Sequence, residues 1–395
     1  MIPPRPHPFA RSRFAELCDR AVATIWEKGW DDQPPLDPDY LWDIGSRGFE
    51  QADEVSIRSA EEVADFRQRL ERLCLSLRNE AQLNALGHTM AYGQLVSAIR
   101  KRHALGRLWR ERPDLAQTPI AAPIIVVGQM RSGTTRMQRL LAADPKLSGT
   151  RFCDNIDPLP RAPDTSPLRG AAALFMARKL NPWLDAFHPF GVTRTDEEIG
   201  WLSASLSPAA FEAQWRIPGF VAFDEEHEAD SVYREFARIL RTDAAANGNA
   251  ARPRALKCPQ YAQDIPAIIR VIPDAQIVLC TRDRAQVLKS SVSMVASQMA
   301  IQSDAGDLDW LQSEWARKFD LRQERFEQFL SGFSGRVSRV DFDELGRDWR
   351  AVMAAVYADL GREFGSDARI AMSAEMALSR TGAHRQHRQI MHDCD

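Results

Sequence analysis

One loop has residue types and spacing suited to binding an anion. It reads Gly128-Gln-Met-Arg-Ser-Gly-Thr-Thr135, with an apolar run before it and a helical pattern after it. This is the frame of a phosphate-binding loop, but Thr134 replaces the Lys that reaches the β- and γ-phosphates in NTP-binding loops. Backbone N–H groups and the helix dipole would face one phosphate. The loop therefore predicts an anion site and argues against ATP or GTP hydrolysis.

Two further cations follow apolar runs later in the chain. Lys257 ends Ala255-Leu-Lys, and Arg282 follows Ile277–Thr281, with Ser290 two helical turns beyond. Ligands of parallel sheets bind beyond the carboxyl ends of the strands. The three features together predict a polyanionic ligand. Alternatively, Arg282 pairs with a nearby aspartate and Ser290 is only a helix residue.

The elements that would position these residues alternate between strand and helix. The expected strands are Ile124–Val127, Arg254–Lys257, Gln276–Thr281 and Val337–Phe342. The expected helices are Arg136–Ala142, Pro266–Val271, Arg284–Met294 and Trp349–Leu360, with a separate long helix over residues 311–329. This alternation predicts an α/β fold, with a P-loop-type parallel sheet flanked by helices.

The chain divides near residue 118, where Pro113 and Pro119 interrupt the helical pattern. Residues 1–118 are expected to form an N-terminal helical region, in which apolar residues recur every three or four positions from Val63 to Leu77. Residues 119–395 are expected to form the α/β domain. A helical insertion at about 151–250 interrupts this domain and is placed to cover the site.

Composition excludes several classes of protein. Hydrophobic residues make up 44% of the sequence and charged residues 27%, which is ordinary for a globular protein. The net charge of −3 does not indicate the positive surface that a nucleic-acid-binding protein requires. The six cysteines are scattered, as in a reduced compartment, and no apolar run is long enough to span a membrane. The first residues lack the apolar core of a signal peptide. We expect a cytoplasmic protein without an integral membrane segment or nucleic-acid partner; nothing in the sequence indicates its oligomeric state.

The motifs resemble those of sulfotransferases that use 3′-phosphoadenosine-5′-phosphosulfate (PAPS), in their bacterial branch. Arg131-Ser-Gly-Thr-Thr135 is similar to the first family motif, and Arg282 with Ser290 to the second. Leu256-Lys-Cys-Pro-Gln260 resembles the bacterial Leu-Lys-Ser-Pro-Gln. Further similarities at Ile272–Ala275 and Phe342–Leu345, and in the N-terminal helices, extend the resemblance over nearly the whole chain.

The resemblance implies a role for each motif. The first motif, which comprises Arg131, Ser132, Gly133, Thr134 and Thr135, would hold the 5′-phosphosulfate. Arg282 and Ser290 would hold the 3′-phosphate, and Lys257 would lie near the bridging oxygen. PAPS would be the sulfuryl donor, no metal would be required, and the acceptor would be a hydroxyl, or an amine, of a small molecule, glycan or lipid.

Two parts of the sequence depart from the family pattern. Arg284 stands where relatives usually carry Pro. The segment Arg380–Arg385 is only loosely similar to the basic loop that closes over the 3′-phosphate in relatives. The tail residues His384, His387, His392 and Cys394 match no common zinc spacing, and we expect them to be solvated.

The general base is the least constrained assignment. Asp154 is the first choice, because relatives often carry Glu after the phosphate-loop helix; alternatively it caps a helix or pairs with Arg151 or Arg161. Glu197 and Glu198 are further candidates for the base, because relatives show acidic residues here; alternatively they are dipole partners at the start of a helix. His188 is a third candidate, although a histidine among apolar residues more often has a structural role. Two other functions stay open: a nucleotide kinase-like P-loop transferase, and a non-catalytic protein that binds PAPS or its product.

Overall fold

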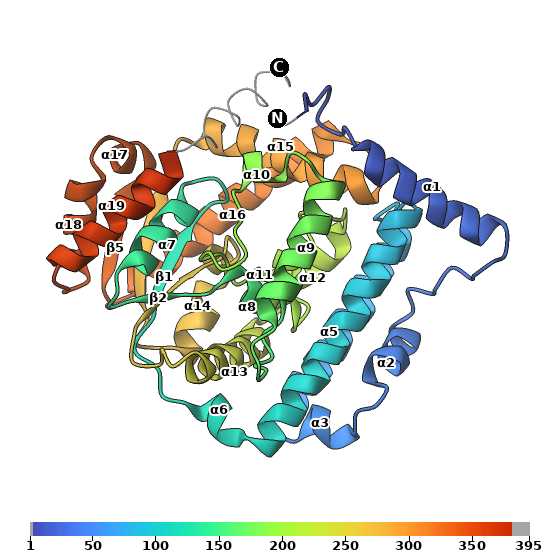
Figure 1. The fold of residues 1–395 in the computed structure, drawn as a ribbon, viewed down its shortest axis with the longest axis horizontal. Helices are drawn as coiled ribbons and strands as arrows, with labels where there is room; N and C mark the ends of the chain where they lie inside the picture. The colour runs from blue at the N-terminus through green and yellow to red at the C-terminus, as the bar shows by residue number, and fades with distance from the viewer. Residues whose placement is uncertain (1–2, 381–395) are drawn as a thin grey trace.

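The computed structural model describes residues 3–380 (Figure 1). Five parallel strands form one sheet in the order β2-β3-β1-β4-β5. The strands are β1 Ile124–Gly128, β2 Ser148–Gly149, β3 Arg254–Lys257, β4 Gln276–Thr281 and β5 Val337–Asp341. The predicted α/β class is confirmed, and four strands lie where the sequence places them. No sequence pattern indicated β2, because a strand of two residues is too short to show alternation.

The sheet is buried between two layers of helices. Ile124 and Val126 of β1 pack in one apolar cluster, and Ile125 and Val127 in another, as alternation along a strand requires. The first layer contains α7 Thr134–Ala143, α17 Phe342–Arg347, α18 Trp349–Asp359 and α19 Ser366–Arg380. The opposite layer contains α13 Asp230–Ala246 and α14 Tyr261–Val271, with Phe326 of α16 Leu308–Gly332. The all-apolar strand β1 is thereby covered on both faces.

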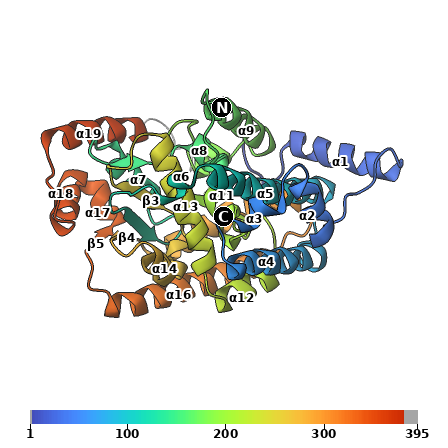
Figure 2. The same cartoon turned by 90° about the horizontal axis from the view of Figure 1, so that it is seen from below.

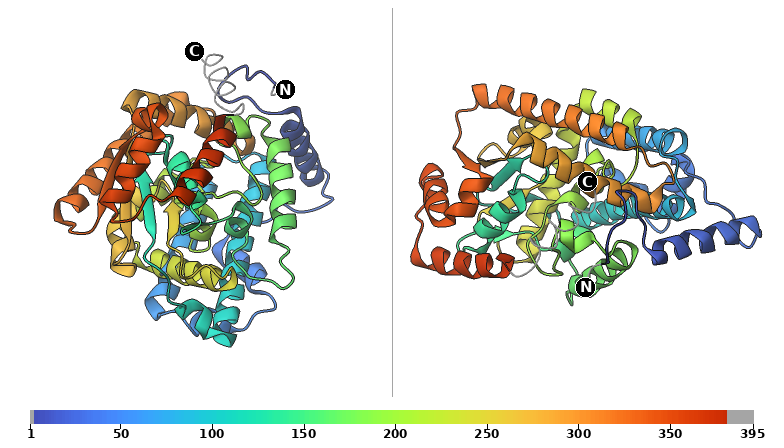
Figure 3. Two further views of the ribbon diagram at one scale, coloured as in Figure 1. Left: turned by 60° about the vertical axis from the view of Figure 1, so that its left-hand side comes forward. Right: turned by 90° about the horizontal axis from the view of Figure 1, so that it is seen from above.

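Two long helices, α15 Arg284–Gln302 and α16 Leu308–Gly332, pack against each other, and Figure 3 shows them side by side. Helix α15 begins immediately after β4 and the Arg282 turn, so it leaves the carboxyl edge of the sheet. Helix α16 also packs on α14. The pair therefore forms a wall beside the region where anion-binding residues were expected.

The N-terminal region is helical, and its helices are α1 Arg13–Glu27, α2 Pro38–Ser46, α3 Gln51–Val55, α4 Ala60–Asn79, α5 Ala85–Glu111 and α6 Pro113–Gln117. Phe66, Leu70 and Leu77 of α4 are buried on one face, as their spacing predicted. They share a cluster with Phe211 and Trp215 from the insertion. The N-terminal helices thus support the segment that covers the site, while α1 packs on α5 and extends outward at the edge of the molecule (Figure 2).

The insertion between β2 and β3 is mostly helical, as expected. It contains α8 Phe152–Ile156, α9 Ser166–Leu180, α10 Leu184–Phe187, α11 Ile199–Ser203, η1 Pro208–Ala210, α12 Pro218–Glu226 and α13. Within residues 3–380 no helix is long and apolar enough to cross a membrane.

Candidate active site

The loop between β1 and α7 has a backbone that few residues could adopt. Gly133, the N-cap of α7, has φ +90°, and a Cβ atom there would lie 2.3 Å from a ring carbon of Phe342. Arg131 also has a left-handed backbone, with φ +70°. The first N–H groups of a helix have no partners within it, so those of α7 are directed at the loop. This is the strand–turn–helix geometry that the sequence predicted for an anion site.

The two arginines and the serine of the motifs lie together. Arg131 Nε donates to Ser290 Oγ at 2.9 Å, and Arg282 Nη1 donates to the carbonyl oxygen of Arg131 at 3.0 Å. Burial, with a smaller effect from Arg282, lowers the pKa of Arg131 to about 10. The charge of Arg282 thus disfavours the charged form of Arg131, and an anion bound near both groups would offset this repulsion.

A cavity of about 520 Å³ opens in front of this loop. Gly133, Thr134, Thr135, Arg131 and Arg282 line it. Two predicted ligands do not: Ser132 is 1% exposed with its hydroxyl on the Gln129 carbonyl, and Ser290 is 3% exposed. Ser290 therefore positions Arg131 in this structure.

The loop end of the cavity also contains residues that the motif comparison did not assign. Phe342 lines it, with the Arg282 guanidinium 4.3 Å and the Arg136 guanidinium 5.1 Å from the centre of its ring. Arg139 and Arg194 line it too. Arg136 and Arg139 lie one helical turn apart on α7, and this spacing is the signal in the sequence that could have indicated them.

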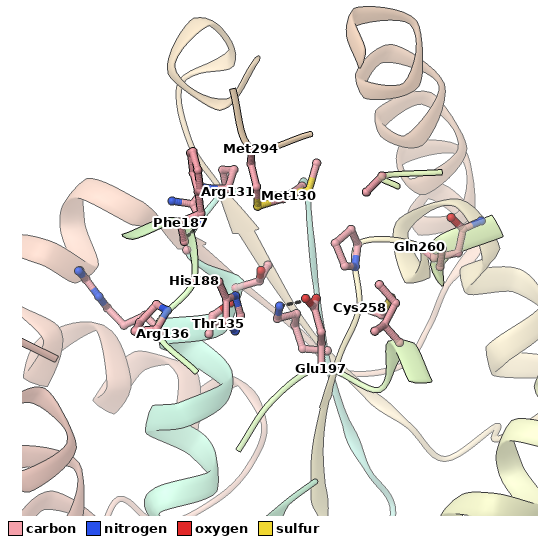
Figure 4. A pocket seen from close by; sticks show the side chains of 18 of the residues that line it. Met130, Arg131, Thr135, Arg136, Phe187, His188, Glu197, Cys258, Gln260 and Met294 are labelled. Carbon is pink, nitrogen blue, oxygen red and sulfur yellow. Dashed lines mark hydrogen bonds and ion pairs between the residues drawn. The ribbon is translucent and has the colours of Figure 1, made fainter. Parts of the chain in front are cut away.

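Lys257 and Glu197 meet in the same cavity. Lys257 Nζ lies 2.6 Å from Glu197 Oε2, and Figure 4 shows the contact as a dashed line. The Lys257 side chain is 4% exposed and the Glu197 side chain 20%. Both sequence-predicted residues are thus present, one at the end of β3 and one just before α11.

Glu198 holds the backbone of Lys257 in place. Its Oε2 accepts from the Lys257 backbone N–H at 2.8 Å and from the Tyr261 hydroxyl at 3.2 Å. Glu198 is fully buried, and burial raises its pKa to about 7 despite these hydrogen bonds. It does not line the cavity.

The placement of Asp154 requires a correction. Asp154 does not line the cavity, and its carboxylate accepts from Arg151 Nε at 2.6 Å and from Arg151 Nη2 at 2.7 Å. The first-choice base is therefore held in the alternative arrangement, an ion pair with Arg151. The sequence left both arrangements open, and the choice depends on the folded chain, in which Asp154 lies outside the cavity.

His188 lines the cavity, and its Nε2 lies 2.9 Å from Asp196 Oδ1. His188, Asp196 and Glu197 are the one group within residues 3–380 whose ligand atoms cluster closely enough for a metal, all within 4.8 Å. Cationic side chains already contact the two carboxylates of this cluster. Lys257 pairs with Glu197, and Arg139 lies 3.6 Å from Asp196. The histidines and cysteine of the tail, and Thr381–Arg385 of the loosely similar basic segment, lie outside the described residues.

Comparison with known families shows to which family the chain belongs. Residues 123–366, more than half of the chain, match the model of the Sulfotransferase family. The chain belongs to the sulfotransferase family. No curated protein matches it significantly.

Two solved sulfotransferases share the fold. Sulfotransferase STF1 from Mycobacterium tuberculosis is 22% identical in sequence and superimposes with a TM-score of 0.77. The match covers 91% of the present chain and 99% of the STF1 chain. Sulfotransferase STF9 from Mycobacterium avium is 16% identical with a TM-score of 0.78, covering 89% of this chain and 90% of its own. Because both structural similarities cover most of the present chain, they include the N-terminal helices of this sulfotransferase.

Proposed function

We propose that this sulfotransferase moves a sulfuryl group from PAPS to a hydroxyl, or an amine, of a small acceptor. One observation carries the proposal: the Lys257–Glu197 pair shares a cavity with the phosphate loop, Arg131 and Arg282. Cations that can bind a phosphosulfate thus lie beside a carboxylate that can accept a proton. The Thr134 loop lacks the Lys expected for NTP chemistry.

In this proposal each group of the site has a part in an in-line transfer. The N–H groups of α7 and Arg131 bind the 5′-phosphosulfate, and Arg282 binds the 3′-phosphate. The acceptor oxygen attacks sulfur as the bond from sulfur to the phosphate oxygen breaks, and Lys257 stabilises the charge that develops on the leaving oxygen. Glu197 takes the acceptor's proton in this proposal, in place of Asp154. Its contact with Lys257 would loosen when the sulfuryl group lies between them.

The test is transfer of label from [³⁵S]PAPS to a mixed panel of phenols, alkyl alcohols and amines. Wild-type protein should give a labelled organic product and release 3′,5′-ADP. Tight binding of 3′,5′-ADP without any transfer would support a non-catalytic nucleotide-binding protein. Transfer of phosphate from [γ-³²P]ATP to the same panel, with none from PAPS, would support the kinase-like alternative and reject this proposal.

A further inference from the structure

Most of the large apolar side chains that are exposed among residues 3–380 lie on three helices, α1, α9 and α19. They are Phe14, Leu17 and Ile25 on α1, Leu168, Phe175 and Met176 on α9, and Ile370 and Leu378 on α19. All three helices lie along one side of the molecule, which is the upper edge in Figure 2 and the lower edge in the right-hand view of Figure 3. Together these side chains form a surface that we call the apolar face. Exposed apolar areas of this extent mark interaction sites.

Helix α9, in the middle of this side of the molecule, is apolar on its inner and its outer surface. Gly170 and Leu174 are buried against the body, while Leu168, Phe175 and Met176 are exposed. A helix that is apolar all round is normally buried on every side. Nothing in the described part of the chain covers the outer surface of α9, so its sequence suits an apolar environment outside this chain.

Helix α1 separates its apolar and acidic side chains. Phe14, Leu17 and Ile25 lie on one side of it, because they are three and eight residues apart. Glu16 and Glu27 each follow a member of this stripe by two residues, which is about 200° round the helix. The exposed carboxylates of α1 therefore lie away from the apolar face.

Helix α19 joins the apolar face to the cavity. Its exposed residues Ile370, Ala374, Ala377 and Leu378 share one side of the helix. Leu378 is 65% exposed and also lines the cavity. Helix α10, which packs on α9, contributes Phe187 to the lining of the same cavity. The cavity thus reaches the surface beside the apolar face.

Cations flank the apolar face. The charged residues of α9 are Arg169, Arg178 and Lys179. The two arginines pair with neighbouring aspartates, whereas Lys179 has no acidic partner among the described residues. Lys28, three residues after Ile25 and on the same side, also has none within residues 3–380. Exposed aliphatic and aromatic residues beside such lysines are typical of helices that lie in the interface of an anionic membrane.

We propose that the apolar face docks on a membrane surface that contains anionic lipids, with the mouth of the cavity at that surface. Leu168, Phe175 and Met176 enter the boundary between headgroups and acyl chains, and Lys28 and Lys179 contact the lipid phosphates. With 15 residues α9 is shorter than a membrane span, so the contact is peripheral. Two copies of the chain joined through α9 would instead bring cations against cations, because α9 carries no carboxylate. This surface goes beyond the proposed reaction and does not depend on it.

The test is co-sedimentation of the full chain with lipid vesicles. One set contains phosphatidylcholine alone, and the other contains phosphatidylcholine and phosphatidylglycerol in equal amounts. Wild-type protein should bind the anionic vesicles at least about tenfold more strongly, and added salt should weaken that binding. No binding to either set, or equal binding to both, would overturn the inference.

Variants at exposed positions identify the surface that binds. The combined substitutions Leu168→Ser, Phe175→Ser and Met176→Ser should lower the partition coefficient on anionic vesicles at least about tenfold, because they remove the apolar area that enters the membrane. Leu75→Ser is the control, since Leu75 is exposed on α4, on the lower side of the molecule in Figure 2. Thermal unfolding followed by circular dichroism reports that each variant is folded. Unchanged binding by the folded triple variant would contradict the assignment of this surface.

The lysine is tested by a single substitution. Lys179→Gln removes one charge at an exposed position and should weaken binding to anionic vesicles about fivefold, with little change on phosphatidylcholine alone. Equal binding of Lys179→Gln and wild type to the anionic vesicles would reject the contact of Lys179 with lipid.

Light scattering in the absence of lipid distinguishes a membrane surface from self-association. Wild-type protein and the triple variant should have the same mass in solution. A wild-type dimer that dissociates in the triple variant would show that the apolar face joins two copies, and the membrane assignment would be rejected. None of these measurements uses PAPS, so failure of the membrane inference and failure of sulfuryl transfer are separate results.

Discussion

Lys257 Nζ lies 2.6 Å from Glu197 Oε2, which joins the end of β3 to the segment before α11. In the proposed reaction these two groups act on opposite partners, the lysine on the leaving oxygen and the carboxylate on the attacking one. In that reaction their contact would be a resting arrangement that the substrates separate. The isolated bridge between Arg151 and Thr195 holds the Glu197 segment near this position.

Removal of the lysine should affect the transition state more than nucleotide binding. Lys257→Ala is expected to lower kcat by at least about a hundredfold, because its charge is required as the leaving oxygen develops. The affinity for 3′,5′-ADP should change little. Steady-state kinetics and calorimetry measure the two effects, with Lys146→Ala as control, since the Lys146 side chain is 71% exposed beside Glu363. An unchanged kcat would remove Lys257 from the reaction centre.

The proton acceptor is tested by a pair of isosteric variants. Glu197→Gln removes basicity with little change in shape and should lower kcat by about 10²–10⁴-fold. Asp154→Asn should keep most of the activity, because Asp154 is paired with Arg151 and does not line the cavity. Rates are compared at saturating PAPS over a range of pH. The opposite ranking of the two variants would restore Asp154 as the base.

Local sequence patterns were sufficient for the parts of the site that follow directly from strands. Lys257 and Arg282 end buried apolar runs, so their position at the carboxyl edge could be predicted before the fold was seen. The choice between Asp154 and Glu197 could not be made in this way, because it depends on how the insertion folds back. The Glu212–Arg322 contact spans a sequence separation of 110 residues, and no local pattern indicates it.

The nucleotide assignment predicts a preference for a 3′-phosphate. Wild-type protein should bind 3′,5′-ADP at least about tenfold more tightly than 5′-AMP, as expected for a charge-assisted contact. Arg282→Ala should remove most of this preference. Arg284→Ala should retain it, because Arg284 is half exposed and pairs with Asp320. Calorimetry with both nucleotides measures the ratio; equal affinities in the wild type would reject the role of Arg282.

Chelation tests the absence of a required metal. Turnover with PAPS is expected to survive EDTA, because Lys257 and Arg131 supply the positive charge that Mg²⁺ provides between β- and γ-phosphates in NTP enzymes. The carboxylates of Asp196 and Glu197 already contact Arg139, His188 and Lys257. Complete loss of activity in EDTA, with recovery on adding Mg²⁺, would favour the kinase-like alternative.

Glu198 should make stability depend on pH in a direction opposite to that of an ordinary ion-paired carboxylate. Its pKa is raised from 4.5 to about 7, chiefly by burial, so the folded state binds this proton more tightly than the unfolded state does. The stabilisation that this proton gives is full below about pH 4.5 and is lost as the pH rises through about 7, a change of about 3 kcal/mol in the free energy of unfolding.

The Glu198→Gln variant tests this effect, because its side chain stays neutral and can still accept from the Lys257 backbone N–H. Denaturant unfolding between pH 5 and 7, conditions chosen to bracket this shift, should therefore show a shallower fall in the free energy of unfolding for Glu198→Gln than for wild type. Some slope should remain, because burial also raises the pKa of Asp264. Glu324→Gln, at an exposed position of α16, is the control. Identical slopes in wild type and Glu198→Gln would show that the Glu198 carboxylate does not retain its proton in the folded protein.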